Sequence, residues 1–199
     1  MAKLSEVRKA AAYRFTQPAV QLLAKTPITP SALTWFGFLL TVGAAALITK
    51  GYLLAAGVVV LFAGFFDILD GALARHTNRT TPFGAVLDST LDRLSEGILL
   101  LGILALYARE PSTTGVLLAS AALLGSLLVS YIRARGESLG LECQKGLFTR
   151  PERVIVLVLG LLLGHIDYAL IIALAIIVVF SFITVGQRLV HLWQQTKSR

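Results

Sequence analysis

The chain has 199 residues, of which 56% are hydrophobic and only 15% are charged. This balance is far more apolar than that of an ordinary soluble domain, and it indicates that the solvent is a lipid bilayer. The formal net charge is +7, but no module of aromatic and basic residues lies outside the apolar runs, so we expect anionic lipid headgroups rather than nucleic acid as partners. The single cysteine, Cys143, excludes an intrachain disulfide.

The amino-terminal segment is predicted to lie in the membrane interface. Residues 4–24 alternate basic and apolar positions, which is typical of an interfacial amphipathic helix, with a solvated tail as the alternative. The segment is interrupted by Pro18 and has no small-residue cleavage site after a compact apolar core. It therefore does not resemble a signal peptide.

The apolar runs that follow predict an all-α integral membrane protein with six transmembrane helices, a single domain over residues 1–199 whose core is 30–194. The runs lie at 31–49, 52–66, 97–108, 114–132 and 154–186. A spanning helix needs about 20 residues at a rise of about 1.5 Å each, so the last run is too long for one crossing. Divided at the polar break 164–167, it gives helices at 148–164 and 166–193. The second helix extends to Ala74, and the third begins near Phe83.

The basic residues predict the orientation of these helices. With six spans, both termini and the second and fourth loops share one side of the membrane. All but two of the 18 Lys and Arg residues fall on that side, and the exceptions, Lys50 and Arg109, lie in the short opposite loops. Because cytoplasmic loops carry the excess of basic residues, we expect a multi-pass protein of the cell membrane with cytoplasmic termini and a cytoplasmic site.

Four of the 11 acidic residues fall within one short stretch. Two sets of positions each share one helical face, because their spacings follow the helical repeat: Asp67, Asp70, Gly71 and Ala74, then Gly84, Asp88 and Asp92. Only residues 76–83 separate Arg75 from Gly84, so the two faces can oppose each other. We therefore expect the four carboxylates to converge.

Converging carboxylates in a membrane protein need positive charge. An unpaired acid in a membrane helix costs about 2.5–3.5 kcal/mol on insertion scales. Four oxygen-bearing side chains suit hard divalent cations, so we expect Mg²⁺, with two ions as the simplest arrangement and Mn²⁺ as an alternative. A salt-bridge network with Arg75, Arg79 and Arg93 is the alternative. The small residues beside the acids either admit a ligand or let helices pack closely.

The string D-x2-D-G-x2-A-R-x8-G-x3-D-x3-D resembles the signature of the CDP-alcohol phosphatidyltransferases. That resemblance implies a six-helix membrane enzyme, usually a homodimer, that holds two metal ions and a CDP-linked lipid. It implies metal ligation by Asp67, Asp70, Asp88 and Asp92, with Asp92 also acting as general base. The residues expected at the CDP-linked lipid are Gly71, Ala74, Arg75, Thr81 and Gly84, together with Ser31, Ala32, Leu33 and Thr34 after Pro30. An acceptor hydroxyl would attack the lipid-bound phosphorus as CMP departs.

Basic residues of the second half suggest a phosphorylated acceptor, because guanidinium groups chelate phosphate oxygens. The stretches 130–135, 150–153 and 187–189 resemble the phosphatidylinositol phosphate synthase branch of the family, except that Arg133 stands where a lysine is usual. The residues that this resemblance places at the phosphate of inositol phosphate are Ser130, Arg133, Arg135, Arg153 and Arg188. Individual arginines could instead obey the positive-inside rule or bind lipid headgroups. Glu96 is expected to play only a supporting polar role.

Other functions stay open from the sequence. A phosphatidylglycerophosphate synthase needs a similar phosphate pocket, and an archaetidylinositol phosphate synthase carries similar strings and uses an ether lipid. A divalent-cation transporter would also place acids within membrane helices, but near the midplane. An intramembrane prenyltransferase would release pyrophosphate, whereas the reaction expected here releases CMP.

Overall fold

The computed structural model describes residues 17–143 and 146–197, and these residues form helices without strands. The all-α prediction is therefore confirmed for the part of the chain that is described. Residues 17–23 are helical and belong to the segment 4–24 that we expect in the membrane interface. The rest of that segment, 4–16, lies outside the described residues.

Six further helices follow, close to the predicted positions. They are α2 (Pro30–Thr49), α3 (Leu53–His76), α4 (Pro82–Arg109), α5 (Thr113–Ser138), α6 (Arg150–Leu162) and α7 (Ala169–Lys197). Four of the described helices, α2, α3, α5 and α7, are long and apolar enough to cross a membrane. α4 has 28 residues but carries the charged motif, and α6 has only 13 residues. Six spans therefore remain a prediction.

Three helices begin with the same local signal, a threonine cap followed by a proline in the first turn. Thr29 caps α2 by accepting a hydrogen bond from the backbone of Ala32, and Thr81 caps α4 by accepting one from Gly84. Thr149 starts α6 with a capping box in which the Glu152 side chain accepts from the Thr149 backbone. Threonine caps satisfy amides that have no helical partner, and proline fits the first turn because it has no N–H to satisfy.

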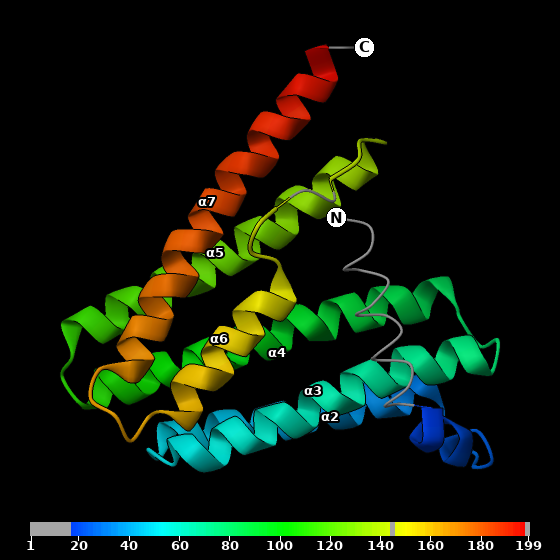
Figure 1. Ribbon diagram of the computed structural model, residues 1–199, viewed down its shortest axis with the longest axis horizontal. Coiled ribbons are helices and arrows are strands. Elements are labelled where there is room, and N and C mark those ends of the chain that lie inside the picture. Colours follow the sequence, from blue (N-terminus) through cyan, green and yellow to red (C-terminus); the bar gives the residue numbers. More distant parts are fainter. Residues whose placement is uncertain (1–16, 144–145, 198–199) are drawn as a thin grey trace.

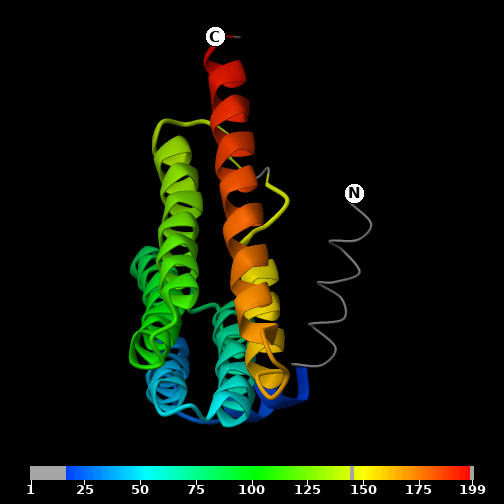
Figure 2. The same cartoon turned by 90° about the vertical axis from the view of Figure 1, so that its left-hand side faces the viewer.

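The helices form two arms that meet at one end. α2 packs against α3 and α4, α5 packs against α7, and α4 also packs against α5. Figure 1 shows the arms diverging from the side of the short turns 50–52 and 110–112. α6 contacts both α3 and α7, and its amino-terminal end lies in the opening between the arms (Figure 1). In Figure 2, α5 and α7 rise side by side above α2 and α3.

The main core lies where the arms meet. It contains fully buried side chains from every long helix, among them Ile48, Ile103, Leu161 and Leu174. Small residues allow close approach between helices, because a Cβ added to Gly160 would lie 2.5 Å from the Cβ of Ala173. A second cluster joins Val20, Leu33, Leu69 and Leu73, and it holds the 17–23 helix against α2 and α3.

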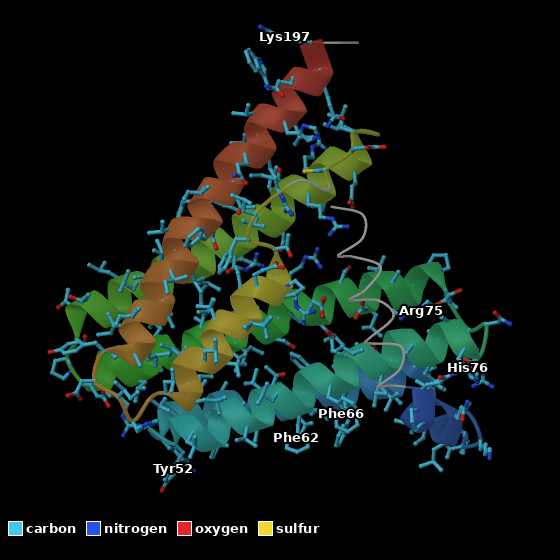
Figure 3. All side chains as sticks on the ribbon, viewed as in Figure 1. Tyr52, Phe62, Phe66, Arg75, His76 and Lys197 are labelled. Atoms are coloured by element: carbon cyan, nitrogen blue, oxygen red, sulfur yellow. The ribbon has the colours of Figure 1, made fainter. Side chains whose placement is uncertain are left out.

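The outer faces of the helices carry many exposed apolar side chains, including Phe62 on α3. Phe62 points away from the neighbouring helices in Figure 3. Phe66 makes an edge-to-face contact with Phe36 of α2 at a centroid distance of 4.9 Å. An extensive exposed apolar surface is typical of a membrane or protein contact rather than of a water-soluble monomer.

Candidate metal and nucleotide site

Three of the four predicted carboxylates gather where the end of α3 faces the start of α4. Asp67 and Asp70 of α3 and Asp88 of α4 each offer one oxygen, and these oxygens lie within 4.8 Å of one another. Asp70 is the most enclosed of the three, with 4% of its surface exposed. The helical spacing of the acids and the short connection between the helices account for this convergence.

Asp92, the fourth carboxylate, is linked to this cluster by Arg150. The guanidinium Nη2 lies 2.7 Å from Asp92 Oδ1, and Nη1 donates to Asp67 Oδ2 at 3.0 Å. Arg150 is the first residue of α6, and 83 positions separate it from Asp67. Sequence reasoning included Arg150 only in the stretch 150–153 and missed this contact, because no local pattern joins two residues so far apart.

The carboxylates suit a hard divalent cation. Among the described residues, Asp70 Oδ2 is buried and has no hydrogen-bond partner. A buried carboxylate oxygen without a donor is costly, and a cation ligated at that oxygen removes the cost. Clustered carboxylate oxygens are the ligands that Mg²⁺ and Mn²⁺ prefer. The three acids therefore fit a metal site.

A cavity of about 480 Å³ opens directly beside Asp70 and Asp88. Seven of the nine residues predicted to contact a CDP-linked lipid line it: Ser31, Thr34, Gly71, Ala74, Arg75, Thr81 and Gly84. The other two do not: Ala32 is exposed, and Leu33 is buried in the second apolar cluster. Sequence reasoning did not assign Arg79 and Thr80 to this cavity, although both line it.

Glycines keep the cavity open. A Cβ on Gly71 would lie 3.3 Å from Nη1 of Arg75, whose side chain folds back along α3. Figure 3 shows Arg75 and His76 near the carboxyl end of that helix. A Cβ on Gly84 would lie 2.9 Å from Oγ1 of Thr81, the hydroxyl that caps α4. A larger residue at either glycine would therefore crowd the cavity wall and displace a polar group that lines it.

The basic residues predicted to bind the acceptor differ in exposure. Arg153 is 2% exposed and forms a double hydrogen bond with Glu96, through Nε to Oε1 at 2.5 Å and through Nη2 to Oε2 at 2.8 Å. Glu96 is thus the partner of a buried cation, which agrees with its expected supporting role. Arg188 is also buried and donates to the carbonyl of Val129, the neighbour of Ser130.

The remaining acceptor candidates lie near the end of α5. Ser130 is half-buried, whereas Arg133 and Arg135 are exposed. Arg133 pairs with Glu137 at 2.8 Å on the same helix. Arg188 lies within electrostatic range of both Arg133 and Arg153, so α5, α6 and α7 bring three of the predicted arginines into one region.

The site geometry agrees with a comparison against protein families. The model of the CDP-alcohol phosphatidyltransferase family matches residues 27–185, which include the cavity, the carboxylates and α6. The chain belongs to the CDP-alcohol phosphatidyltransferase family. It is therefore an enzyme of this class, as the sequence motif predicted.

Individual relatives match over nearly the whole chain. The chain is 40% identical over 186 residues to the archaetidylinositol phosphate synthase of Methanothermobacter thermautotrophicus, covering 92% of this chain and 91% of that protein. It is 37% identical over 203 residues to the phosphatidylinositol phosphate synthase of Mycobacterium tuberculosis, covering 97% and 92%. The resemblance to the phosphatidylinositol phosphate synthase branch is confirmed.

Solved structures of the mycobacterial synthase share the fold. The crystal structure with CDP-DAG bound has a TM-score of 0.84 and 36% identity, over 90% of this chain and 94% of that one. The structure in complex with manganese and citrate has a TM-score of 0.82, over 89% and 88%. A homologue thus carries both a CDP-linked lipid and a divalent metal.

Replacing Asp70 should weaken metal binding. Asp70→Asn removes the charge of the most enclosed carboxylate, and we expect at least a ~10-fold higher Kd for Mn²⁺, because hard cations depend on the number of charged ligands. Titration of the purified protein with Mn²⁺, followed by electron paramagnetic resonance, measures the change. Asp167→Asn is the matched control, since Asp167 is exposed in the turn between α6 and α7 and should leave the Kd unchanged. Unaltered Mn²⁺ binding in Asp70→Asn would remove Asp70 from the ligand set.

Proposed function

We propose that the chain transfers a phosphatidyl-type group from CDP-diacylglycerol, or an ether-lipid analogue, to inositol phosphate and releases CMP. The observation that carries this proposal is the position of the 480 Å³ cavity against Asp70 and Asp88. A nucleotide held in that cavity places its diphosphate beside the carboxylate cluster, where cations can bridge the two. The lipid chains of the same molecule can remain in the bilayer.

The cavity walls suit the donor. Arg75 and Arg79 supply positive charge for a diphosphate. Threonine and serine side chains offer hydrogen bonds, and Gly71, Ala74 and Gly84 leave room for the ligand to approach the backbone. Ala32 and Leu33 do not line the cavity. Their proposed role is to hold the backbone of segment 31–34 in place, so that Ser31 and Thr34 face the donor. The CDP-DAG complex of the mycobacterial synthase supports this choice of donor.

We propose that Asp67, Asp70, Asp88 and Asp92 hold two Mg²⁺ ions, with Mn²⁺ able to replace them. When bound, such ions would neutralise the diphosphate and stabilise the charge that develops on the departing CMP. Asp70 would supply its buried unpaired oxygen. Asp67 and Asp88 would complete the group from opposite helices, and Asp92 would contribute from the next turn of α4.

Asp92 is proposed as the general base. It retains 18% of its side-chain surface exposed and lies one helical turn beyond Asp88, so an acceptor hydroxyl can reach it next to the carboxylate cluster. The hydroxyl oxygen forms a bond to the lipid-bound phosphorus while Asp92 takes the hydroxyl proton, and the bond from that phosphorus to CMP breaks. One direct displacement completes the transfer without a covalent enzyme intermediate.

The acceptor is proposed to enter from the side of α5 and α7. Its phosphate would bind Ser130, Arg133, Arg135, Arg153 and Arg188. Arg188 lies within electrostatic range of both Arg133 and Arg153, and guanidinium groups favour a doubly charged phosphate over an uncharged polyol. Both relatives named above with assigned activities make an inositol phosphate lipid, which supports inositol phosphate over glycerol phosphate.

The membrane arrangement is proposed from the helices and the charges. We propose that α2 to α7 form six spans in the cell membrane, that both termini and the site face the cytoplasm, and that residues 4–24 lie in the interface. The ends of α3 and the starts of α4 and α6 then share the cytoplasmic side with most Lys and Arg residues, as the positive-inside rule requires. We also propose a homodimer as the working assembly.

CMP release should depend on metal and on the acceptor. Purified protein in detergent receives CDP-diacylglycerol with inositol phosphate, glycerol phosphate or free inositol, each with Mg²⁺ or with a chelator. We expect fast CMP release only with Mg²⁺ and inositol phosphate, because the arginines bind the acceptor through its phosphate. A parallel series with CDP-archaeol identifies the donor lipid. Faster release with glycerol phosphate would contradict the proposed acceptor, and release of pyrophosphate would contradict the reaction.

Asp92→Asn should stop turnover while leaving the donor bound. The amide cannot accept the hydroxyl proton, so we expect kcat to fall by about 10²-fold or more. The Kd for CDP-diacylglycerol should stay within about threefold, since the cavity walls are intact. CMP release measures the first quantity and equilibrium binding of labelled donor the second. Glu110→Gln, at the opposite end of α4, is the matched control, and near-normal turnover in Asp92→Asn would contradict the base assignment.

A further inference from the structure

Arg150 occupies an unusual position, because it joins two carboxylates of the site from a third helix. Its Nη1 lies 3.0 Å from Asp67 Oδ2 and its Nη2 lies 2.7 Å from Asp92 Oδ1. The capping box of Thr149 and Glu152 fixes where α6 begins, and therefore places Arg150 at this point. None of the proposed roles above uses Arg150.

The same carboxylate serves two kinds of cation. Asp67 Oδ2 accepts the hydrogen bond from Arg150, and Asp67 also belongs to the group of three acids that fits a divalent ion. We propose that Arg150 is a built-in competitor of the divalent cation: its guanidinium and the metal share Asp67 and Asp92, and its charge lowers the affinity of the site for metal. This inference rests on the proposed function only for the roles of Asp67 and Asp92 as metal ligands.

Arg150 reaches the two carboxylates through its terminal nitrogens and stays partly exposed. Its side chain is 30% exposed, and both ion pairs run through the terminal Nη atoms. Among the described residues, its Nε has no hydrogen-bond partner. A guanidinium that is fixed only through its terminal nitrogens can turn away from Asp67 and Asp92 when a metal binds there.

Arg153, one turn further along α6, behaves differently. It is 2% exposed and is paired through two nitrogens with Glu96. A buried pair of this kind is costly to break, because either partner left alone is an uncompensated charge. Arg153 and Glu96 therefore anchor α6 to α4, and we expect this anchor to keep α6 in place when Arg150 is replaced.

If Arg150 competes for the carboxylates, its removal should raise the affinity of the site for metal. A competitor that is removed leaves the carboxylates more negative, so metal binds more tightly. If Arg150 only held the site together, its loss would let the carboxylates move apart, and the affinity for metal would fall. Mn²⁺ affinity therefore separates the two roles, and it does so without a measurement of turnover.

The test uses the full-length protein in detergent and Mn²⁺ alone as the probe. We expect Arg150→Gln to lower the Kd for Mn²⁺ by about 5- to 10-fold, which corresponds to removal of one nearby positive charge at partial exposure. Arg109→Gln is the matched control: Arg109 lies at the opposite end of α4 and donates to the carbonyl of Thr49, so its loss should change the Kd by less than about twofold. Isothermal titration gives both values.

A second variant and a second readout guard against a folding defect. Arg150→Lys keeps the charge but contacts one carboxylate at a time, so its Kd should fall between those of the native chain and Arg150→Gln. In a chelator, Arg150→Gln should unfold at a lower temperature than the native chain, because Asp67 and Asp92 lose their ion-pair partner. Saturating Mn²⁺ should therefore raise the unfolding temperature of Arg150→Gln by more than that of the native chain.

The outcomes are distinguishable. If the native chain binds Mn²⁺ and needs it for CMP release, but Arg150→Gln, still folded, binds Mn²⁺ equally or less tightly, the competition by Arg150 is contradicted and the proposed function stands. If Arg150→Gln does not fold, an Arg150→Lys chain whose Kd does not fall contradicts the competition in the same way. If the native chain binds no Mn²⁺, the proposed metal site fails, and the inference about Arg150 fails with it.

Discussion

The fold depends on one constraint: acidic side chains that converge between membrane helices must be matched by positive charge. Each unpaired acid costs about 2.5–3.5 kcal/mol in a membrane helix, and Asp67, Asp70 and Asp88 place their oxygens within 4.8 Å of one another. Arg150, on a helix far away in the sequence, supplies part of this positive charge. Asp70 Oδ2 is buried and finds no hydrogen-bond partner within residues 17–143 and 146–197, so a cation bound there would supply the remaining positive charge.

This constraint explains how the surrounding elements are built. The carboxyl end of α3 and the start of α4 must lie face to face, so the connection between them is short. The threonine caps at 29, 81 and 149 begin three helices without leaving their first amides unpaired. Glycines beside the acids open a cavity of about 480 Å³, so that charge and space for a diphosphate occur together.

Much of this arrangement could be predicted because it is local in sequence. The spacing of Asp67 and Asp70, and of Asp88 and Asp92, places each pair on one helical face, and the short link brings the two faces together. Apolar runs and the turn after α6 predict helix positions within a few residues of those observed. The segment 31–34 could be predicted only as a block, and the structure separates it: Ser31 and Thr34 line the cavity, whereas Leu33 serves the apolar core.

The contacts that could not be predicted join distant parts of the chain. Arg150 pairs with Asp67 across 83 positions and Arg153 with Glu96 across 57, and helical periodicity carries no information about such pairs. One local signal was present. Arg150 and Arg153, three residues apart in the first turn of α6, share one helical face, as Asp92 and Glu96 do on α4. The pairing of those two faces, however, is decided by how α6 packs between the arms.

The central claim is that the carboxylates of α3 and α4 form one chelating group, and anomalous X-ray diffraction from crystals grown with Mn²⁺ tests it most directly. We predict a manganese peak ligated by carboxylate oxygens of Asp67, Asp70 and Asp88, next to the cavity of about 480 Å³. Aspartates turned away from one another, with the manganese bound elsewhere or not at all, would contradict it.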